Sequence, residues 1–469
     1  MKKAFLYCLI IFSLISNYSS SQYTHLYSFV STPDGSTHDG FLPTGSLVSD
    51  GTFLYGMTRF GGTGGIDVDG TIFKILPDGT GYLKLMDFDG VTNGSNPNGS
   101  LIFDGTFLYG MTRQGGINDL GTIFKILPDG TGYVKLLDFA GATNGEYPEG
   151  TLFSDGTFLY GMTLSGGTDN LGTVFKIKPD GSNFTKLLDF SGVNNGSSPV
   201  SSLISNGTYL YGCTAQGGTN NLGTIFKILP DGSGFVKLLD FEGLTNGKFP
   251  RGDLYYDGSF LYGMTSQGGI SYNGTIFKLL SDGSGYQKLL DFESTMNGKY
   301  PNGSLISDGT FLYGMTYMGG TSNNGTLFKI KTNGTDFTKL WDFSVGENGR
   351  SPLGTLMSDG SNLYGMTKYG GTPSNYGVIF KYGLTAGIEE GNTDIEFSIY
   401  PNPTSGIIEL KTSANGEQLV LITNIMGEEV FSKEYDLNSG LDFTIDISLE
   451  KAGIYFIRIG NCTRRIIKL

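Results

Sequence analysis

The chain has 469 residues and a formal net charge of −13, with 75 glycines, 13% aromatic residues and only 16% charged residues. This composition is typical of turn-rich antiparallel sheet, so we expect an all-β protein of two or three domains. No lysine or arginine cluster precedes the final "RRIIK", which excludes an electrostatic footprint for nucleic acid. The three cysteines, Cys8, Cys213 and Cys462, are far apart and show no disulfide or metal-binding spacing.

The first 21 residues have the pattern of a secretory signal peptide. Lys2 and Lys3 precede the apolar run "AFLYCLIIFSLI", and a small-residue stretch ends at Ser21. We therefore predict cleavage between Ser21 and Gln22. No later apolar run approaches the roughly 18 residues of a membrane-spanning helix, so no transmembrane segment is expected.

The next 360 residues or so are built from a repeated segment of roughly the length typical of propeller blades. The pentapeptide "LYGMT", with one variant "LYGCT", occurs seven times, mostly 51 residues apart, beginning at Leu54, Leu108, Leu159, Leu210, Leu261, Leu312 and Leu363. Each period contains four segments rich in strand formers, such as "GSLIFDG", "TFLYGMT", "GTIFKIL" and "YVKLLDF" between Gly99 and Phe139. Four strands per period are typical of one blade of a β-propeller.

The turns place all long loops on one rim of the predicted propeller. "DG" at Asp104 and "PDGTG" at Pro128 form short hairpins, whereas the loops after the second and fourth strands are longer. The last copy ends after its third strand at Tyr382, and "LYSF" at Leu26 matches the missing fourth strand. We therefore predict a seven-bladed β-propeller over residues 22–387, in which the N-terminal strand completes the last blade and removes the exposed sheet edges.

Several residues recur with the strands. The strands are nearly continuously apolar, as expected for sheets buried on both faces. We expect Gly56 and its equivalents in "LYGMT" to let the sheets converge near the axis, in preference to a ring of Met or Thr residues that binds a ligand. The lysine after Phe (Lys74 to Lys381) and the aspartate before Phe (Asp87 to Asp342) are predicted to form an ion pair within each blade rather than a charged binding ring.

The motifs "LYGMTxxGG", "GTxFKI" and "DGTGYxKLLDF" resemble the GloVer tandem-repeat family over about residues 23 to 382. The resemblance implies a β-propeller on a secreted or surface bacterial protein, loosely similar to kelch blades. It implies no particular activity or ligand.

The composition changes near Gly387, where the repeats end. Apolar segments such as "QLVLITNI" and "GIYFIRI" predict a small β-sandwich over residues 388–469. "SIYPNPTSG", "IMGEEV", "AGIYFIRI" and "RRIIKL" resemble the type A C-terminal sorting domain of type IX secretion in Bacteroidetes, with a generic immunoglobulin-like adhesive module as the alternative. The resemblance implies the type IX machinery as partner, removal of the domain, and release or surface anchoring of the mature protein. Its motif residues are Pro401, Asn402, Pro403, Gly406, Gly427, Gly453 and Tyr455.

The sequence offers little material for catalysis or metal binding. Its only histidines are His25, in the predicted closing strand, and His38, in a loop, and most aspartates belong to "DG" turns. "DVDG" at Asp67 is an incomplete calcium-loop pattern. "RGD" at Arg251 fills a slot that recurs in every repeat, so we interpret it as coincidence rather than as an integrin-type motif. We expect no catalytic residue, no metal and no cofactor.

We therefore expect a monomeric binding module, secreted or anchored at the cell surface, whose ligand is a glycan or a surface protein. The long-loop rim is the predicted binding surface because the loops vary there. Aromatic residues suit contacts with a glycan or protein ligand, although they serve equally well to pack loops onto the rim. The candidates stand before the recurring proline (Tyr147, Phe249 and Tyr300) and before the "GG" pair (Phe60, Tyr317 and Tyr369).

Two other functions remain open at this point. One is a polysaccharide lyase or glycosidase built on the propeller, which a carboxylate pair unmatched in the other blades and converging on the central funnel would favour. The other is a purely structural surface component.

Overall fold

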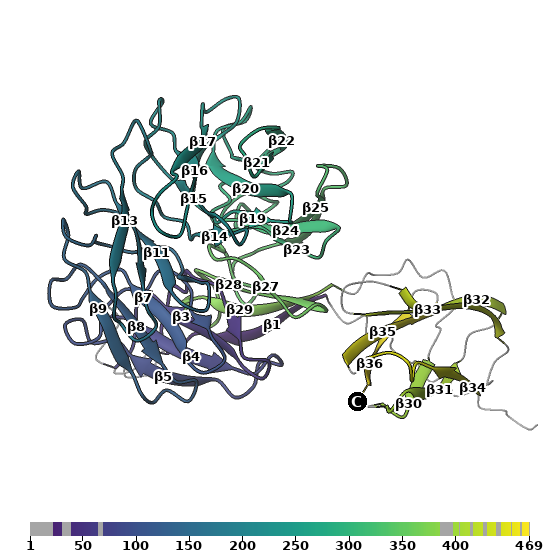
Figure 1. The fold of residues 1–469 in the computed structure, drawn as a ribbon. Helices are drawn as coiled ribbons and strands as arrows, with labels where there is room; N and C mark the ends of the chain where they lie inside the picture. Colours follow the sequence, from purple (N-terminus) through teal and green to yellow (C-terminus); the bar gives the residue numbers. More distant parts are fainter. Residues whose placement is uncertain are drawn as a thin grey trace, which may run out of the picture. The chain divides into compact units, whose positions relative to one another are not determined.

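The computed structural model in Figure 1 describes residues 22–30, 39–63, 69–384, 397–402, 404–412, 416–424, 429–437, 442–451, 453–459 and 462–468. The chain divides into two compact units, Met1–Thr385 and Ala386–Leu469. The regular elements of the described residues are all β-strands, in agreement with the predicted all-β class. No helix in this part of the chain is long and apolar enough to cross a membrane.

The first unit contains seven antiparallel sheets that follow one another along the chain, which we number as repeats 1 to 7. Repeats 1 to 3 comprise β2 (Val48–Ser49), β3 (Leu54–Thr58), β4 (Thr71–Ile75) and β5 (Leu83–Asp87); β6 (Ile102–Phe103), β7 (Leu108–Thr112), β8 (Thr122–Ile126) and β9 (Val134–Asp138); and β10 (Phe153–Ser154), β11 (Leu159–Thr163), β12 (Thr173–Ile177) and β13 (Thr185–Asp189).

Repeats 4 to 7 have the same strand order, with one additional strand, β18, in repeat 5. Their strands are β14 (Ile204–Ser205), β15 (Leu210–Thr214), β16 (Thr224–Ile228) and β17 (Val236–Asp240); β18 (Lys248–Pro250), β19 (Tyr255–Tyr256), β20 (Phe260–Gln267), β21 (Thr275–Leu280) and β22 (Gln287–Asp291); β23 (Ile306–Ser307), β24 (Phe311–Thr316), β25 (Thr326–Lys331) and β26 (Thr338–Asp342); and β27 (Met357–Ser358), β28 (Asn362–Thr367), β29 (Val378–Gly383) and β1 (Tyr23–Ser28).

The core of this unit lies between successive sheets. In β3, Leu54 packs with Tyr364 of repeat 7, whereas Tyr55 on the opposite face packs with Leu108 and Phe124 of repeat 2. Each of the seven pairs of neighbouring sheets encloses one such cluster. The predicted burial of the strands on both faces is therefore confirmed, and every sheet depends on two neighbours for its packing.

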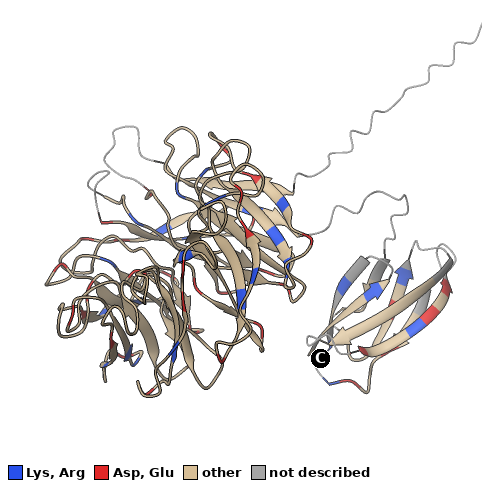
Figure 2. Ribbon diagram, turned by 90° about the horizontal axis from the view of Figure 1, so that it is seen from above, with Lys and Arg blue, Asp and Glu red and all other residues tan. Residues whose placement is uncertain are grey.

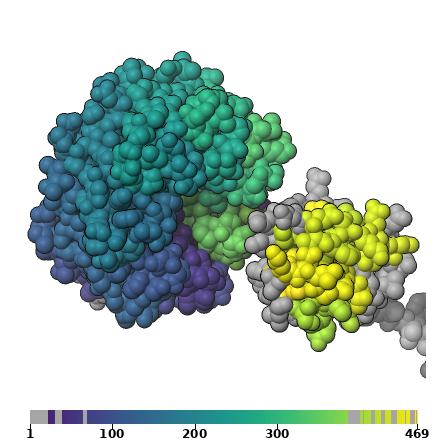
Figure 3. Space-filling view, viewed as in Figure 1, coloured from purple at the N-terminus to yellow at the C-terminus, as the bar shows by residue number. Residues whose placement is uncertain are grey.

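The N-terminal strand completes the seventh sheet, as predicted. β1 pairs with β29, with Tyr23 opposite Tyr382 and Ser28 opposite Val378. The purple first repeat and the green last repeats consequently lie side by side in Figure 3. The buried ring of Tyr23 stacks on Trp341 with ring centroids 4.3 Å apart, and its hydroxyl donates a hydrogen bond of 2.6 Å to the carbonyl oxygen of Asn348.

The glycine of the pentapeptide is required for a reason other than the predicted convergence of sheets at the axis. A Cβ atom added to Gly56 would lie 2.5 Å from Cζ of Phe73, which stands opposite on β4 of the same sheet, and 3.1 Å from Leu47. The glycine therefore provides space for a buried phenylalanine ring. The neighbouring Met57 and Thr58 are buried as well, and Thr58 shares a hydrogen bond of 2.8 Å with Thr71, so neither forms an open ligand ring.

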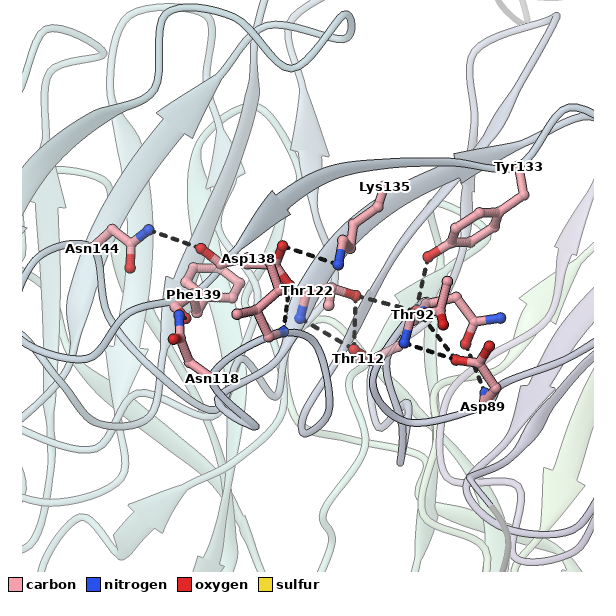
Figure 4. Close-up of polar contacts among 12 residues, drawn as sticks. Asp89, Thr92, Thr112, Asn118, Thr122, Tyr133, Lys135, Asp138, Phe139 and Asn144 are labelled. Carbon is pink, nitrogen blue, oxygen red and sulfur yellow. Dashed lines mark hydrogen bonds and ion pairs between the residues drawn. The ribbon is translucent and has the colours of Figure 1, made fainter.

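The predicted pairing of the recurring charges is wrong. In repeat 2, Asp138 pairs with Lys135 of its own strand at 3.0 Å, and not with the lysine after Phe (Figure 4). Residues i and i+3 of a regular strand point to opposite faces, but a bulge interrupts the pairing of β8 with β9 between Ile123 and Phe124. The same pair recurs at Lys84–Asp87, Lys186–Asp189, Lys237–Asp240, Lys288–Asp291 and Lys339–Asp342.

The lysine after Phe has a different partner. Lys125 Nζ lies 4.7 Å from the ring centroid of Phe107 and donates a hydrogen bond of 3.1 Å to the carbonyl oxygen of Pro179 in the next repeat. Figure 2 shows many of the basic residues (blue) on the strands and acidic residues (red) mainly in loops and turns. Lys74, Lys125, Lys176 and Lys278 thus join their repeats to the short hairpin of the next repeat.

The short "DG" turns are held by their aspartate side chains. Asp104 Oδ1 accepts hydrogen bonds of 2.8 Å from the backbone N–H groups of Thr106 and Phe107, and Oδ2 accepts one of 2.9 Å from the Tyr109 hydroxyl. Burial acts to raise the pKa of Asp104, but these hydrogen bonds outweigh it and lower the pKa. Repeat 4 has Asn206 at this position. Its Oδ1 accepts the two backbone hydrogen bonds, and its Nδ2 donates the third to the Tyr211 hydroxyl.

The second unit contains two sheets around one core. One sheet comprises β30 (Phe397–Tyr400), β31 (Ile407–Thr412) and β34 (Asp442–Asp446), and the other β33 (Glu429–Leu437), β32 (Gly416–Asn424), β35 (Gly453–Ile459) and β36 (Cys462–Lys468). The core combines residues of both, including Ile408 and Ile445 of the first sheet and Val420 and Ile457 of the second.

Replacing Tyr23 by alanine should destabilise the first unit by about 3 to 5 kcal/mol, because the variant removes a large buried side chain from the closing sheet. Chemical unfolding followed by aromatic fluorescence measures the change, and Thr24→Ala on the exposed face of the same strand is the matched control. Deletion of residues 22–30 should expose the edge of β29 and promote aggregation. Unchanged stability in both variants would contradict closure by β1.

Changing the six turn aspartates to asparagine, as repeat 4 does naturally, should flatten the loss of stability in acid. A lowered folded-state pKa contributes stability above the unfolded-state value of about 4, and this contribution is lost as pH falls through the folded-state value. The variant combines Asp50→Asn, Asp104→Asn, Asp155→Asn, Asp257→Asn, Asp308→Asn and Asp359→Asn. Urea unfolding between pH 2 and pH 6 gives the free energy of unfolding of the wild type and of the variant as a function of pH. Parallel curves would contradict the stabilising role of the charged turn aspartates.

Candidate functional site

The seven repeats meet at a ring of small residues, which we call the inner ring: Gly45, Gly99, Gly150, Ser201, Gly252, Gly303 and Gly354. A Cβ atom on Gly45 would lie 2.3 Å from the carbonyl oxygen of Gly99, and one on Gly354 would lie 2.1 Å from that of Gly45. The contacts of the six glycines run from one repeat to the next and return from the last repeat to the first. Backbone packs on backbone at these glycines, where a Cβ atom finds no space, whereas repeat 4 accommodates the side chain of Ser201.

A closed circle of hydrogen bonds follows directly after the inner ring. The N–H of Ser46 donates to Ser100 Oγ at 2.7 Å, and the N–H of Thr355 donates to Ser46 Oγ at 2.7 Å. Every repeat makes this bond to the next one, with Oγ, Oγ1 or Oδ1 as the acceptor, through Ser46, Ser100, Thr151, Ser202, Asp253, Ser304 and Thr355. We call these seven residues the hydrogen-bonded circle.

The inner ring and the hydrogen-bonded circle line a cavity of about 400 Å³. Its remaining walls come from two positions of the repeats, the residue before the inner ring and the residue after "LYGMT". Both positions adjoin the long loops, so the cavity belongs to the long-loop rim. Six of the lining side chains are ionisable, and they are Arg59, Arg113, Arg251, Lys368, Glu149 and Asp253.

One of the two carboxylates has a partner on each of its oxygens. Glu149 Oε1 accepts a hydrogen bond of 2.6 Å from Arg113 Nε, and Oε2 accepts one of 2.7 Å from Asn98 Nδ2. Arg59 Nε, by contrast, is buried and has no hydrogen-bond partner among the residues that the structure describes. Burial lowers the pKa of Arg59, and the positive charge of Arg113 lowers it further while Glu149 raises it.

The other carboxylate belongs to the "RGD" tripeptide. Asp253 Oδ1 accepts a hydrogen bond of 2.6 Å from the Ser202 N–H, and its own N–H donates to Ser304 Oγ at 2.7 Å. Burial raises the pKa of Asp253, against the hydrogen bonds that favour its charged form. Gly252 belongs to the inner ring and Arg251 is exposed at the cavity. Gly252 and Asp253 thus take the places in the inner ring and in the hydrogen-bonded circle that every repeat fills.

The predicted aromatic residues before the proline adopt a left-handed backbone conformation. Tyr147, Phe249 and Tyr300 each have φ of 56°, and the equivalent residues of the other four repeats have similar values. All three side chains are partly buried. A cation lies over each ring, at 5.2 to 5.5 Å from the ring centroid, and these cations are Arg113, Lys248 and Lys299.

The aromatic residues near the "GG" pair fall on two different positions. Phe60 lies beneath Arg59 at 5.2 Å and Tyr369 lies beneath Lys368 at 5.1 Å, so both adjoin cations that line the cavity. Tyr317 instead takes the position of Arg59 in its repeat, and Met318 is the residue equivalent to Phe60. The Tyr317 N–H donates a hydrogen bond of 3.1 Å to the carbonyl oxygen of Tyr300.

The four cations of the cavity were not among the predicted site residues. A sequence signal for three of them exists, because the residue directly after the pentapeptide changes from copy to copy while the pentapeptide does not. It reads Arg59, Arg113, Leu164, Ala215, Ser266, Tyr317 and Lys368. The sequence alone does not show that these seven residues form one surface, because that depends on the ends of the second strands converging in space.

Several predicted positions lie outside the described residues, namely Ser21, His38, Asp67, Pro403 and Gly427. Of the sorting motif, Gly406 packs closely, since a Cβ there would lie 2.5 Å from Cα of Ser448, and the buried Tyr455 donates a hydrogen bond of 2.8 Å to the Lys451 carbonyl oxygen. In the described ranges no group of three or more His, Cys, Asp or Glu residues is arranged to hold a metal ion. Cys213 is a buried free cysteine.

Comparison with known families confirms both resemblances inferred from the motifs. A family model described as the Gloeobacter/Verrucomicrobia repeat matches residues 10–158, 153–278 and 255–412, and one described as a secretion system C-terminal sorting domain matches residues 398–469. No curated protein matches the sequence.

Several solved structures are similar to the chain at low identity. They include an oligogalacturonate lyase in complex with manganese (13% identity, 77% of this chain and 93% of that chain covered, TM-score 0.47) and an oligogalacturonate lyase from Vibrio parahaemolyticus (12%, 77% and 98%, TM-score 0.45). TolB from Acinetobacter baumannii is a third (13%, 58% and 59%, TM-score 0.35). Similarity at this level carries no information about ligand or activity.

Replacing Gly303 of the inner ring by alanine should destabilise the first unit by about 1 to 3 kcal/mol, because the added methyl group overpacks a rigid site. Its Cβ would lie 2.4 Å from the carbonyl oxygen of Gly354. Gly453→Ala is the control, since the nearest heavy atom there is 3.9 Å away. Thermal unfolding measures both variants, and an equal effect of the two would show that the ring tolerates side chains.

Proposed function

The chain belongs to the Gloeobacter/Verrucomicrobia repeat family and ends in a secretion system C-terminal sorting domain, and from this premise we propose that it is a non-enzymatic ligand-binding protein. The sorting domain indicates type IX secretion to the cell surface or the extracellular space. The binding part is a seven-bladed β-propeller and the sorting part a β-sandwich. The ligand, a glycan or a surface protein, enters the cavity at the long-loop rim.

The contrast between a uniform ring and a variable lining carries this proposal. The inner ring and the hydrogen-bonded circle use small residues that repeat with little change, which supports a rigid frame. The residue before the inner ring ranges from apolar to polar, acidic and basic, and the seven residues are Thr44, Asn98, Glu149, Val200, Arg251, Asn302 and Leu353. A rigid scaffold that presents variable side chains to a concave surface is the usual arrangement of a binding site.

A polysaccharide-degrading enzyme is the second candidate, and one observation favours it. Glu149 and Asp253 have no carboxylate counterpart in the other repeats, and both line the cavity. Against it, Arg113 and Asn98 occupy the oxygens of Glu149, and Asp253 accepts a backbone hydrogen bond of the circle. Release of new reducing or unsaturated sugar ends from a polysaccharide panel, abolished in Glu149→Gln, would establish the enzyme instead.

Binding should depend on the aromatic residues of the long-loop rim. We expect Tyr147→Ala, Phe249→Ala and Tyr300→Ala combined to weaken ligand affinity at least tenfold, since aromatic faces supply contact area. The backbone should be unaffected, because alanine is no more strained than tyrosine at positive φ. A glycan array identifies the ligand and calorimetry gives the affinity.

The matched control for this variant combines Phe107→Ala, Phe158→Ala and Phe260→Ala. These three rings also lie beneath lysines, at 4.7 to 4.8 Å, but next to the short turns. Equal loss of affinity in both triple variants, or loss only through unfolding, would mean that the rim aromatics are structural.

Export should remove the sorting domain. The mature protein at the cell surface or in the culture fluid is expected to lack most of residues 388–469, because the matched family is a sorting signal at the end of the chain. Intact-mass measurement of surface and secreted fractions tests this. A major form that still ends at Leu469 would contradict it.

A further inference from the structure

The cavity of the long-loop rim has a charge opposite to that of the chain. The whole protein carries a formal net charge of −13. The lining of the cavity nevertheless contains four cationic side chains against the two carboxylates of Glu149 and Asp253, an excess of two positive charges. Local reversal of sign in a concave site concentrates ligands of the opposite charge.

The cations are not distributed evenly around the inner ring. Lys368, Arg59 and Arg113 follow the pentapeptides of repeats 7, 1 and 2, which are neighbours because Gly354 contacts Gly45 and Gly45 contacts Gly99. The same position in repeats 3 to 6 is uncharged, with Leu164, Ala215, Ser266 and Tyr317. One side of the cavity is thus a continuous basic arc.

The arc is only partly neutralised by the protein. Glu149 pairs with Arg113, but Arg59 Nε is buried without an acceptor among the described residues. The Nε atom itself is closed to a ligand, but Arg59 lines the cavity, and a carboxylate is the planar acceptor that fits a guanidinium best. The basic arc therefore favours an anionic group placed against the part of Arg59 that faces the cavity.

Aromatic rings adjoin each cation of the arc. Arg59 lies over Phe60, Arg113 over Tyr147 and Lys368 over Tyr369, at 5.1 to 5.2 Å from the ring centroids. Such rings hold the cations in place, and none of the three is among the residues that line the cavity. The lining itself adds uncharged polar side chains, including Thr44, Asn98 and Asn302, in a volume of about 400 Å³. Positive charge beside hydrogen-bonding groups for hydroxyls matches a sugar acid better than a small inorganic anion.

Resting on the proposed binding function, we propose that the cavity binds an acidic oligosaccharide, with a uronate carboxylate held by Arg59 and Lys368 and the sugar hydroxyls against the uncharged polar side chains of the lining.

Calorimetry of the purified full chain tests this with oligogalacturonate, oligomannuronate and oligoguluronate, each beside its fully methyl-esterified form. The ester keeps the sugar and removes the charge. We expect at least one acid to bind ten times or more tighter than its ester, and added salt to weaken that binding. Inorganic sulfate and phosphate are titrated in the same way.

The variant Arg59→Gln with Lys368→Gln should weaken binding of the acid at least tenfold and leave the weak affinity for the ester unchanged. The control variant is Lys178→Gln with Lys331→Gln, which removes two positive charges next to the short turns, where Lys331 is half-exposed. This control should change the affinity less than twofold. An equal loss in both double variants would mean that net charge alone is at work and would overturn the site.

The remaining outcomes separate this inference from the proposed function. Equal affinity for acid and ester overturns the acidic specificity and leaves a glycan-binding protein. Binding of inorganic sulfate or phosphate alone, lost in the Arg59 and Lys368 variant, overturns the saccharide as ligand. Binding of no saccharide in any form, charged or esterified, overturns both.

Discussion

Closure of the ring is the constraint on which the rest of the first unit depends. No sheet has a core of its own, because the two faces of each one pack against the preceding and the following repeat. An open chain of repeats would expose the apolar faces of the first and last sheets and the edge of β29. Pairing of β1 with β29 and the circle of hydrogen bonds, which returns from Thr355 to Ser46, satisfy that constraint at the outside and at the centre.

Closure also explains why the site is concave and rigid. Seven backbones converge at the inner ring, six of them at glycines where a Cβ atom finds no space, so the residues just before the ring and at the ends of the second strands surround one cavity. These residues carry little of the packing, which leaves their identity free to serve recognition. The basic arc of repeats 7, 1 and 2 arises only because closure makes the last repeat a neighbour of the first.

The sequence predicted those features that follow from periodicity. Apolar strands at a fixed spacing indicate sheets buried on both faces, and the incomplete last copy indicates that "LYSF" closes the ring. The pairing of Lys135 with Asp138 could not be predicted, because a bulge opposite Ile123 and Phe124 brings residues i and i+3 together. The role of Gly56 was also missed, since it depends on the buried ring of Phe73 on the facing strand. The site was predicted as a rim with a set of aromatic residues. The four cations of the cavity come from repeats 1, 2, 5 and 7, and that they surround one cavity is recognised only in the structure.

Hydrogen exchange of β1 and β29 tests the central claim most directly. If closure couples all sheets, the amides of β1 and β29 should exchange as slowly as those of β8 and β12, through opening of the whole ring. Mass spectrometry of peptides covering these four strands measures the rates under native conditions. Exchange of β1 and β29 that is many times faster than that of β8 and β12 would show that the ring opens locally at its junction and would contradict the account.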